Sequence, residues 1–274
     1  MNRLIFQVNV GNFAPAYYQV CKESVEKYCK KYNIDHEILT EPVLKIRPRN
    51  SKRSENAVER LGYLPIYEKE NAFSADRLAK YDQICIIDSD IFIRDCAPNI
   101  FDELDDDVVF AGVIEQSLPN TPQYFQKILG YSQAQYGSLI NKVPSWPRST
   151  KYGIDFYNMG LMLFSNKIQT YLNGETPEQF IRRKEFEGFV NGEGSWRWST
   201  DQTLLNYWVR STKMPVKNLD WRWNALFKGV RDEVLKDSYF IHFFLSNNLP
   251  QKGAEIPRIV QDLDRASEVK YGHR

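Results

Sequence analysis

Along this chain, short and nearly continuous apolar runs alternate with longer segments in which apolar residues recur at helical spacing. The apolar runs lie at residues 4–10, 34–39, 84–93, 108–113, 156–164, 221–227 and 239–244. Helices are predicted at 15–32, 65–80, 123–129, 178–189, 200–209 and 256–267, and loops at 131–151 and 191–198. Runs that are apolar at almost every position are typical of strands buried on both faces of a sheet. Because the chain also begins with a strand, a helix and a second strand, we expect an α/β fold with a nucleotide-binding type of sheet.

The run at 84–93 is the one in which the hydrophobic pattern is interrupted by two carboxylates. Asp88 and Asp90 are separated only by Ser89, and burying a carboxylate is costly unless a cation pairs with it. On a continuous strand the two side chains would point to opposite faces, but they converge at the strand's end if the chain turns at the small Ser89. Oxygen ligands suit hard divalent ions such as Mg²⁺ or Mn²⁺. Since ligands of open α/β sheets bind beyond the carboxyl ends of strands, we expect a metal–diphosphate site here.

Two features of the first sixty residues allow two interpretations each. Asn9 and Gly11 follow the first strand at once and indicate either phosphate or ribose contact or a plain strand-to-helix turn; the full glycine-rich fingerprint is absent. The segment 45–60 is polar and basic. It is either a solvated loop, or an active-site lid or a surface for an anionic acceptor.

Polar groups in the second half of the chain are also open to a structural and a functional interpretation. Ser199 with Gln202 three residues later fits a capping box, and the same helix start can present Asp201 or Gln202 into a cleft. His242, between bulky apolar residues, is either a core histidine or a metal ligand.

All six tryptophans lie after residue 145. Trp208 and Trp223 are expected in the core because they fall within a predicted helix and strand. Trp196 and Trp198 lie in the glycine-rich loop at 191–198, where an amphipathic ring forms either a sugar platform or a packing contact.

Composition excludes several classes of protein. The 274 residues are 42% hydrophobic, enough for a proper core, and a net charge of +1 gives no nucleic-acid signature. The four cysteines do not form a disulfide framework: Cys21 and Cys29 lie about 12 Å apart by helical rise, and Cys85 is in an apolar strand, so we expect reduced, buried thiols. No signal peptide or membrane-spanning run is apparent. We expect a cytoplasmic protein, with peripheral membrane contact through segment 45–60 left open.

Taken in chain order, these motifs resemble those of the retaining nucleotide-sugar glycosyltransferases of family 8, which include glycogenin-like and lipopolysaccharide galactosyl- and glucosyltransferase-like enzymes. The family has a strand-borne aspartate pair, an Asn-x-Gly strand, an Asp-Gln helix start and a late His. Here they are Asp88–Ser89–Asp90, Asn158–Met159–Gly160, Asp201–Gln202 and His242. Upstream, Tyr67–Glu68–Lys69 looks like the family's donor-contacting segment. The resemblance covers about residues 4–252.

The resemblance implies a single GT-A type α/β domain over residues 1–274, with a Rossmann-like mixed sheet flanked by helices. Its nucleotide-binding part would span about 1–115 and its acceptor-side part about 116–274. It implies a UDP-hexose donor and transfer, with retention, to a hydroxyl of a saccharide, a lipid-linked glycan or a protein. The implied metal ligands for Mn²⁺ or Mg²⁺ are Asp88, Asp90 and His242. Asn9, Gly11, Lys69 and Ser89 would complete the donor site, and Asn158, Asp201 and Gln202 would line the sugar and acceptor side.

After the late His the chain departs from the family, which continues with a glycine and a lysine that reaches the leaving diphosphate. Residues 243–251 contain neither. Lys252 could take the role of that lysine from a longer loop. The departure also motivates an alternative, a catalytically silent protein that binds nucleotides or glycans. A second alternative is a phosphatase of the haloacid dehalogenase type, which places Asp-x-Asp after an apolar strand, although Phe92 stands where that family has Thr or Val.

Overall fold

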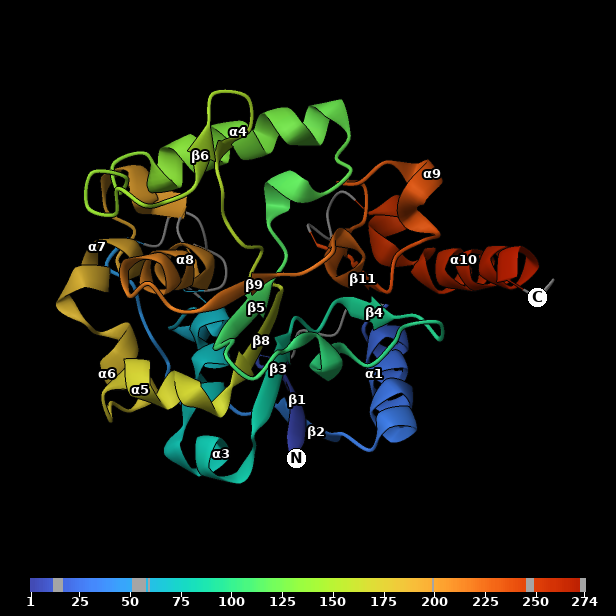
Figure 1. Ribbon diagram of the computed structural model, residues 1–274, viewed down its shortest axis with the longest axis horizontal. Coiled ribbons are helices and arrows are strands. Elements are labelled where there is room, and N and C mark those ends of the chain that lie inside the picture. The colour runs from blue at the N-terminus through green and yellow to red at the C-terminus, as the bar shows by residue number, and fades with distance from the viewer. Residues whose placement is uncertain (12–16, 51–57, 59, 199, 245–248, 272–274) are drawn as a thin grey trace.

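The protein folds around a twisted central sheet with helices on both faces (Figure 1). This computed structural model describes residues 1–11, 17–50, 58, 60–198, 200–244 and 249–271, with only the backbone described at 197, 198 and 266–271. The strands are β1 (Arg3–Val8), β2 (Asp35–Leu39), β3 (Gln83–Ile87), β4 (Ile91–Ile93), β5 (Phe110–Gly112), β6 (Arg148–Ser149), β7 (Gly153–Ile154), β8 (Leu161–Ser165), β9 (Val216–Asn218), β10 (Ala225–Leu226) and β11 (Phe240–His242). The α-helices are α1 (Tyr18–Tyr32), α3 (Ala75–Lys80), α4 (Pro122–Tyr136), α5 (Gln169–Leu172), α6 (Pro177–Ile181), α7 (Glu187–Val190), α8 (Asp201–Ser211), α9 (Asp232–Leu235) and α10 (Ile256–Tyr271).

The main sheet is mixed and has the strand order β2-β1-β3-β8-β5-β9. β1 pairs in parallel with both β2 and β3, whereas β8 runs antiparallel to β3 and β5. The carboxyl end of β3 therefore meets the amino end of β8. This places the aspartate pair beside Asn158–Met159–Gly160 at one edge of the sheet.

Alternate residues of the central strands enter two different hydrophobic cores. Leu4, Phe6, Ile84 and Ile86 belong to one core, and Ile5, Cys85 and Ile87 to the other. Figure 1 shows α5–α8 on the first side of the sheet and α1, α9 and α10 on the second. Because both faces are covered, these strands are apolar at nearly every position, as the sequence indicated.

A second, smaller sheet has the order β10-β11-β4 and adjoins the main sheet through a turn. The chain leaves β3 at Ile87, turns at Ser89 and enters β4 at Ile91, which belongs to the small sheet. The predicted continuous strand at 84–93 is thus two strands in two sheets. The turn at Ser89, which the converging carboxylates require, is confirmed.

Several predicted elements differ from the structure. The predicted helix at 65–80 is a 3₁₀ helix, η2 (Pro65–Phe73), followed by α3, with extended Ser74 between them. Almost all of η2 is buried, and the Glu68 carboxylate in it accepts three backbone N–H groups of residues 43–45. Tertiary hydrogen bonds of this kind override the local helical preference.

Other differences lie where capping or packing decides the boundary. Residues 221–224 form a 3₁₀ helix, η8 (Trp221–Asn224), instead of a strand, because the Asp220 side chain accepts the Arg222 N–H. α4 extends to Tyr136, beyond the predicted end at 129, and the predicted helix at 178–189 is divided into α6 and α7. Thr200 caps α8 by accepting the Gln202 N–H; Ser199, the predicted cap, lies outside the described residues.

The predictions for the sulfur and indole groups are largely confirmed. Cys21, Cys29 and Cys85 are buried free thiols, while Cys96 is exposed. Trp208 and Trp223 are buried in the two cores. Trp196 packs edge-on against Phe189, and its N–H donates to the Gln135 carbonyl, so it is a packing residue and not a platform. The Trp198 side chain lies outside the described part of the chain.

Candidate functional site

The turn between the two sheets brings the aspartate pair to the carboxyl end of β3. The Asp88 N–H donates to the Gly160 carbonyl at 2.8 Å, and the Ile91 N–H donates back to the Asp88 carbonyl at 3.2 Å, which closes the turn. The Phe243 N–H donates to the Asp90 carbonyl at 2.9 Å. The backbone at Asp88 and Asp90 is therefore fixed by β8 on one side and by β11 on the other.

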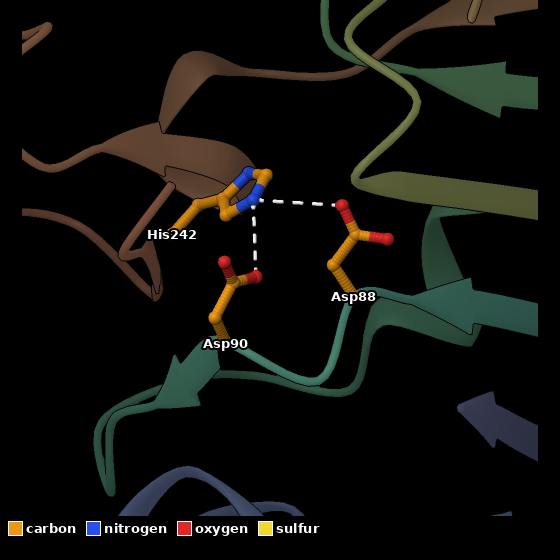
Figure 2. A group of neighbouring side chains, drawn as sticks. All are labelled: Asp88, Asp90 and His242. Carbon is orange, nitrogen blue, oxygen red and sulfur yellow. Dashed lines mark ion pairs between the residues drawn. The ribbon is translucent and has the colours of Figure 1, made fainter. Parts of the chain in front are cut away.

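His242, the last residue of β11, completes a cluster of three potential metal ligands (Figure 2). Its Nε2 lies 3.5 Å from Asp88 Oδ2 and 3.2 Å from Asp90 Oδ1. One ligand atom from each of the three residues lies within 4.8 Å of the others. Two carboxylate oxygens and one imidazole nitrogen fit Mn²⁺ or Mg²⁺. Asp90 Oδ1 is also buried, and the group that it faces is the His242 ring nitrogen, the other potential ligand.

Lys69, in η2, is a buried cation at the centre of the site. Its Nζ lies 2.9 Å from Asp88 Oδ1 and 2.6 Å from Asp201 Oδ2, and it donates to the Met159 carbonyl at 2.9 Å. Burial by itself would lower the pKa of Lys69, but the carboxylates of Asp201 and Asp88 outweigh this effect and raise it. Lys69 is therefore charged, and it joins the aspartate pair to the amino end of α8.

Burial and charge act in opposite directions on the acidic and basic side chains of the cluster. Burial by itself would raise the pKa of Asp90, but His242 outweighs this effect and the pKa lies below its ordinary value, so Asp90 is a carboxylate. Burial would likewise lower the pKa of His242, and Asp90 and Asp88 raise it. Burial raises the pKa of Asp201 in spite of Lys69. The two aspartates thus favour the charged form of His242 as long as no metal is bound.

The Asn158–Met159–Gly160 segment lies against the cluster. The Asn158 side chain accepts the Gly160 N–H at 3.0 Å and donates to Glu115 Oε2 at 3.1 Å. A Cβ added at Gly160 would lie 2.3 Å from His242 Cε1 and 2.6 Å from its Nδ1. Only glycine therefore fits at position 160, because the imidazole lies directly on the backbone.

Two cavities meet at this cluster. One, of about 300 Å³, is lined by Asn9, Lys69, Asp88, Ser89 and Asp90 together with Arg60, Leu61, Pro65 and Ile66. The other, of about 400 Å³, shares Lys69, Asp88 and Asp90 and adds Asn158, Asp201, Gln202 and His242. The predicted donor-side and acceptor-side residues thus line two separate cavities that meet at the aspartate pair.

Two predicted site residues are absent from the linings of both cavities. Gly11 has φ +77° and lies against Leu61, as a strand-to-helix turn would require, and its contact with the donor stays a prediction. Lys252 is exposed in a 3₁₀ turn (Pro250–Gly253) at φ +54°. Its assignment to the diphosphate stays a prediction, as does the division of the domain near residue 115.

Sequence reasoning missed several residues of the larger cavity. Glu115, which follows β5 and is 4% exposed, accepts hydrogen bonds from the Tyr124 hydroxyl and from the Asn158 side chain. Burial raises its pKa. Tyr124, Tyr131 and Phe244 give the same cavity an aromatic wall. The only signal in the sequence was the position of Glu115 at the end of an apolar run, the same kind of signal that identified Asp88.

A comparison with solved structures supports the fold, whereas comparisons by sequence find no match. No protein-family model matches the sequence, and no curated protein matches it either. Among solved structures, mouse xyloside xylosyltransferase 1 aligns with TM-score 0.50 and 13% identity over 91% of this chain and 100% of that one. The galactosyltransferase LgtC, in complex with donor and acceptor sugar analogues, gives 0.45 and 15% over 96% and 95%. GlyE of Streptococcus pneumoniae, a glycosyltransferase, gives 0.46 and 13% over 96% and 60%.

The chain therefore has the GT-A type fold of glycosyltransferases, which confirms the predicted mixed α/β architecture as a single domain. No helix among the described residues is both long and apolar enough to cross a membrane.

Proposed function

We propose that this protein is a metal-dependent, retaining glycosyltransferase that moves a hexose from a UDP-sugar to a hydroxyl group of an acceptor. The observation that carries the proposal is the meeting of Asp88, Asp90 and His242 at the junction of two cavities. The fold supports sugar transfer as the class of activity, and the order of the motifs supports the UDP-hexose donor and retention.

In this proposal one cavity binds the donor nucleotide and the other binds the acceptor. The donor nucleotide occupies the cavity beside Asn9 and Ser89, and Asp88, Asp90 and His242 bind the divalent cation. That cation, when bound, neutralises the charge that develops on the leaving diphosphate. Lys69 keeps the Asp88 and Asp201 carboxylates paired and in place. The hexose then faces Asn158, Asp201 and Gln202 at the mouth of the second cavity.

The acceptor hydroxyl enters from the larger cavity. Tyr124, Tyr131 and Phe244 line it, and aromatic faces of this kind suit the apolar face of a sugar ring. A saccharide or a glycan attached to a lipid or protein fits such a wall.

The first test is to replace Asp90 with alanine. Release of UDP from UDP-glucose or UDP-galactose in the presence of Mn²⁺ should be abolished, and Mn²⁺ binding should weaken, because the cation loses a buried carboxylate ligand. Asp107→Ala is the matched control, since Asp107 ends the exposed Asp105–Asp107 pair of the same spacing. Full activity of the Asp90→Ala protein, or of the wild type in excess chelator, would contradict the proposal.

Two further experiments separate the alternatives. UDP binding by calorimetry without hydrolysis or transfer across a panel of donors and acceptors would favour a silent binding protein, motivated by the changed segment after His242. Phosphate release from a generic phosphoester would favour the phosphatase, which the GT-A type fold does not support.

A further inference from the structure

Asn224, the last residue of η8, contacts His242 of the metal cluster but does not line either cavity. Its side chain is fully buried, with 0% exposure. Asn224 Oδ1 lies 3.2 Å from His242 Nδ1, and Asn224 Nδ2 donates to Asn158 Oδ1 at 2.9 Å. Asn224 therefore joins the only imidazole of the cluster to the Asn-x-Gly segment.

Gly160, Asn158, Asn224 and His242 are joined by a series of hydrogen bonds, and the backbone N–H of Gly160 fixes the direction of each of them. The Gly160 N–H can only donate, and it points at the Asn158 side chain at 3.0 Å, so the atom that it meets must be the amide oxygen. The Asn158 amide nitrogen then faces Glu115 Oε2. The atom of Asn224 that meets the Asn158 oxygen must in turn be its nitrogen, which leaves the Asn224 oxygen toward His242.

The orientation of Asn224 fixes the state of the imidazole. An amide oxygen can only accept, so His242 Nδ1 must carry a proton that it donates to Asn224. When the ring carries a single proton, Nε2 is the nitrogen with the free lone pair. Nε2 is the atom that points at Asp88 and Asp90 (Figure 2).

We propose that Asn224 is the positioning residue of the metal site: it fixes the Nδ1–H tautomer and the ring plane of His242, so that Nε2 binds the cation. The proposal rests on the metal site of the proposed function. Metal-binding histidines commonly donate their second N–H to an oxygen acceptor, and loss of that acceptor typically weakens metal binding about 10–100-fold. Asn224 is the described residue with that geometry here.

The backbone makes Asn224 a rigid partner. η8 begins at the side-chain cap of Asp220, and Trp223 beside Asn224 packs against Tyr239 and Phe240. Directly after Asn224 the chain enters β10, where Leu226 pairs with His242 in parallel register. Asn224 thus lies directly before the strand that pairs with β11, the strand that ends at His242.

The test compares two nearly isosteric substitutions. Asn224→Leu removes both the acceptor for His242 and the donor to Asn158. Asn224→Asp keeps the acceptor but places a second oxygen against Asn158 Oδ1, so it loses only the donor. Both should lower the stability to denaturant, but we expect Mn²⁺ affinity to fall about 10–100-fold only in the leucine variant and to stay within about threefold of wild type in the aspartate variant.

Mn²⁺ binding is measured directly by electron paramagnetic resonance, without a substrate. Protein labelled with ¹⁵N-histidine adds a second readout, because the hyperfine coupling between Mn²⁺ and His242 should be present in the wild type and in Asn224→Asp and lost or diminished in Asn224→Leu. Gln83→Leu is the control: Gln83 is a buried amide at the opposite end of β3. It should lower stability without changing Mn²⁺ affinity.

The outcomes separate this proposal from the proposed function. Wild-type Mn²⁺ affinity and coupling in a folded Asn224→Leu protein would overturn the role of Asn224 and leave the metal site intact. Equal weakening in both Asn224 variants would also overturn it, because the acceptor would then not matter. Failure of the wild type to bind Mn²⁺ would overturn the metal site and this role with it.

Discussion

Gly160 is the residue whose side chain, a single hydrogen, sets the distance between β8 and the imidazole of His242. Any Cβ there would lie 2.3 Å from the ring, and His242 cannot retreat because Asn224 and the two aspartates surround it. The sequence motif Asn-x-Gly thus has a physical cause: Asn158 accepts a hydrogen bond from Asn224, the partner of the imidazole, and Gly160 leaves room for the imidazole beside the backbone.

Gly160→Ala should therefore damage the metal site more than the fold. We expect Mn²⁺ affinity measured by calorimetry to fall at least about tenfold, because the imidazole is displaced from its ligand position. Gly130→Ala is the control, since Gly130 lies in α4 with no atom within 4 Å of an added Cβ. It should raise stability by about 0.5–1 kcal/mol through helix propensity. Unchanged Mn²⁺ binding by Gly160→Ala would show that the ring has room to move.

Lys69 determines how the stability of the site depends on pH. Lys69→Met leaves the buried Asp201 carboxylate without its cation, which should cost about 3–5 kcal/mol at neutral pH. The pKa of Asp201 is already raised from its ordinary value of 3.8, and loss of Lys69 raises it further. A carboxyl whose pKa is higher in the folded state favours folding below its unfolded pKa, and this contribution is lost as the pH rises through the folded pKa.

The deficit of Lys69→Met relative to wild type should consequently grow from pH 5 to pH 8, as measured by urea unfolding. Lys27→Met serves as a control because Lys27 and its partner Asp95 are largely exposed, so little change is expected at either pH. A deficit that does not vary with pH would contradict this prediction, because it would mean that Asp201 has the same protonation state in the variant and in the wild type throughout this range.

At the residue scale, the sequence predicted the groups that carry an unusual signal and missed those defined only by their partners. Asp88 and Asp90 are conspicuous because they interrupt an apolar strand. Asn224 has no local signal, and Glu115 has only its position after an apolar run, which is common for a glutamate. Their roles come from contacts across 18 and 43 residues of chain.

At the element scale, Arg94 joins three segments that the sequence alone does not bring together. It follows β4, its side chain is only 1% exposed, and it pairs with Asp264 of α10 at 3.0 Å. It also donates to the Leu263 carbonyl at 2.9 Å and to the Ser238 carbonyl, just before β11, at 3.1 Å. α10 is thus attached to the small sheet by one buried guanidinium as well as by its apolar face.

Arg94→Met should loosen α10 selectively. The buried Ser238 carbonyl and the partly buried Leu263 and Lys236 carbonyls lose their donor, and Asp264 loses its cation. At about 1–3 kcal/mol for each group, the free energy of unfolding should fall by about 3 kcal/mol. Hydrogen exchange in residues 256–265 should accelerate more than in β1 or β3. Arg258→Met, which removes an exposed ion pair with Asp262 on the same helix, should leave both measurements nearly unchanged. Equal acceleration across the main sheet would contradict the selective attachment.

Element boundaries were predicted well where the hydrophobic pattern is strong and poorly where side-chain hydrogen bonds decide them. The central strands and α8 lie close to their predicted ranges. The prediction of one helix at 65–80 was wrong because the buried Glu68 binds backbone N–H groups from residues 43–45. The prediction of a strand at 221–224 was wrong because Asp220 caps a 3₁₀ turn. Neither of these hydrogen bonds produces a periodic hydrophobic pattern in the sequence.

For the whole molecule, ligand binding should appear as stability. A ligand at about 100 times its dissociation constant stabilises the folded state by about 2.7 kcal/mol, which for a domain of this size raises Tm by about 5–10 °C. We expect Mn²⁺ and UDP together to shift Tm in this range and each alone to shift it less, because each completes the other's site. Asp90→Asn should abolish the combined shift. A full shift with UDP and chelator would contradict metal-dependent donor binding.

The turn at Ser89 separates the metal ligands by architecture as well as by sequence. Asp88 directly follows a strand of the main sheet, whereas Asp90 precedes and His242 ends strands of the small one. Three side chains that share one ion would therefore cross-link the two sheets close to the turn at which the chain passes directly from β3 to β4. A displacement of the small sheet against the main sheet would change the spacing of the three ligands and with it the affinity for the metal.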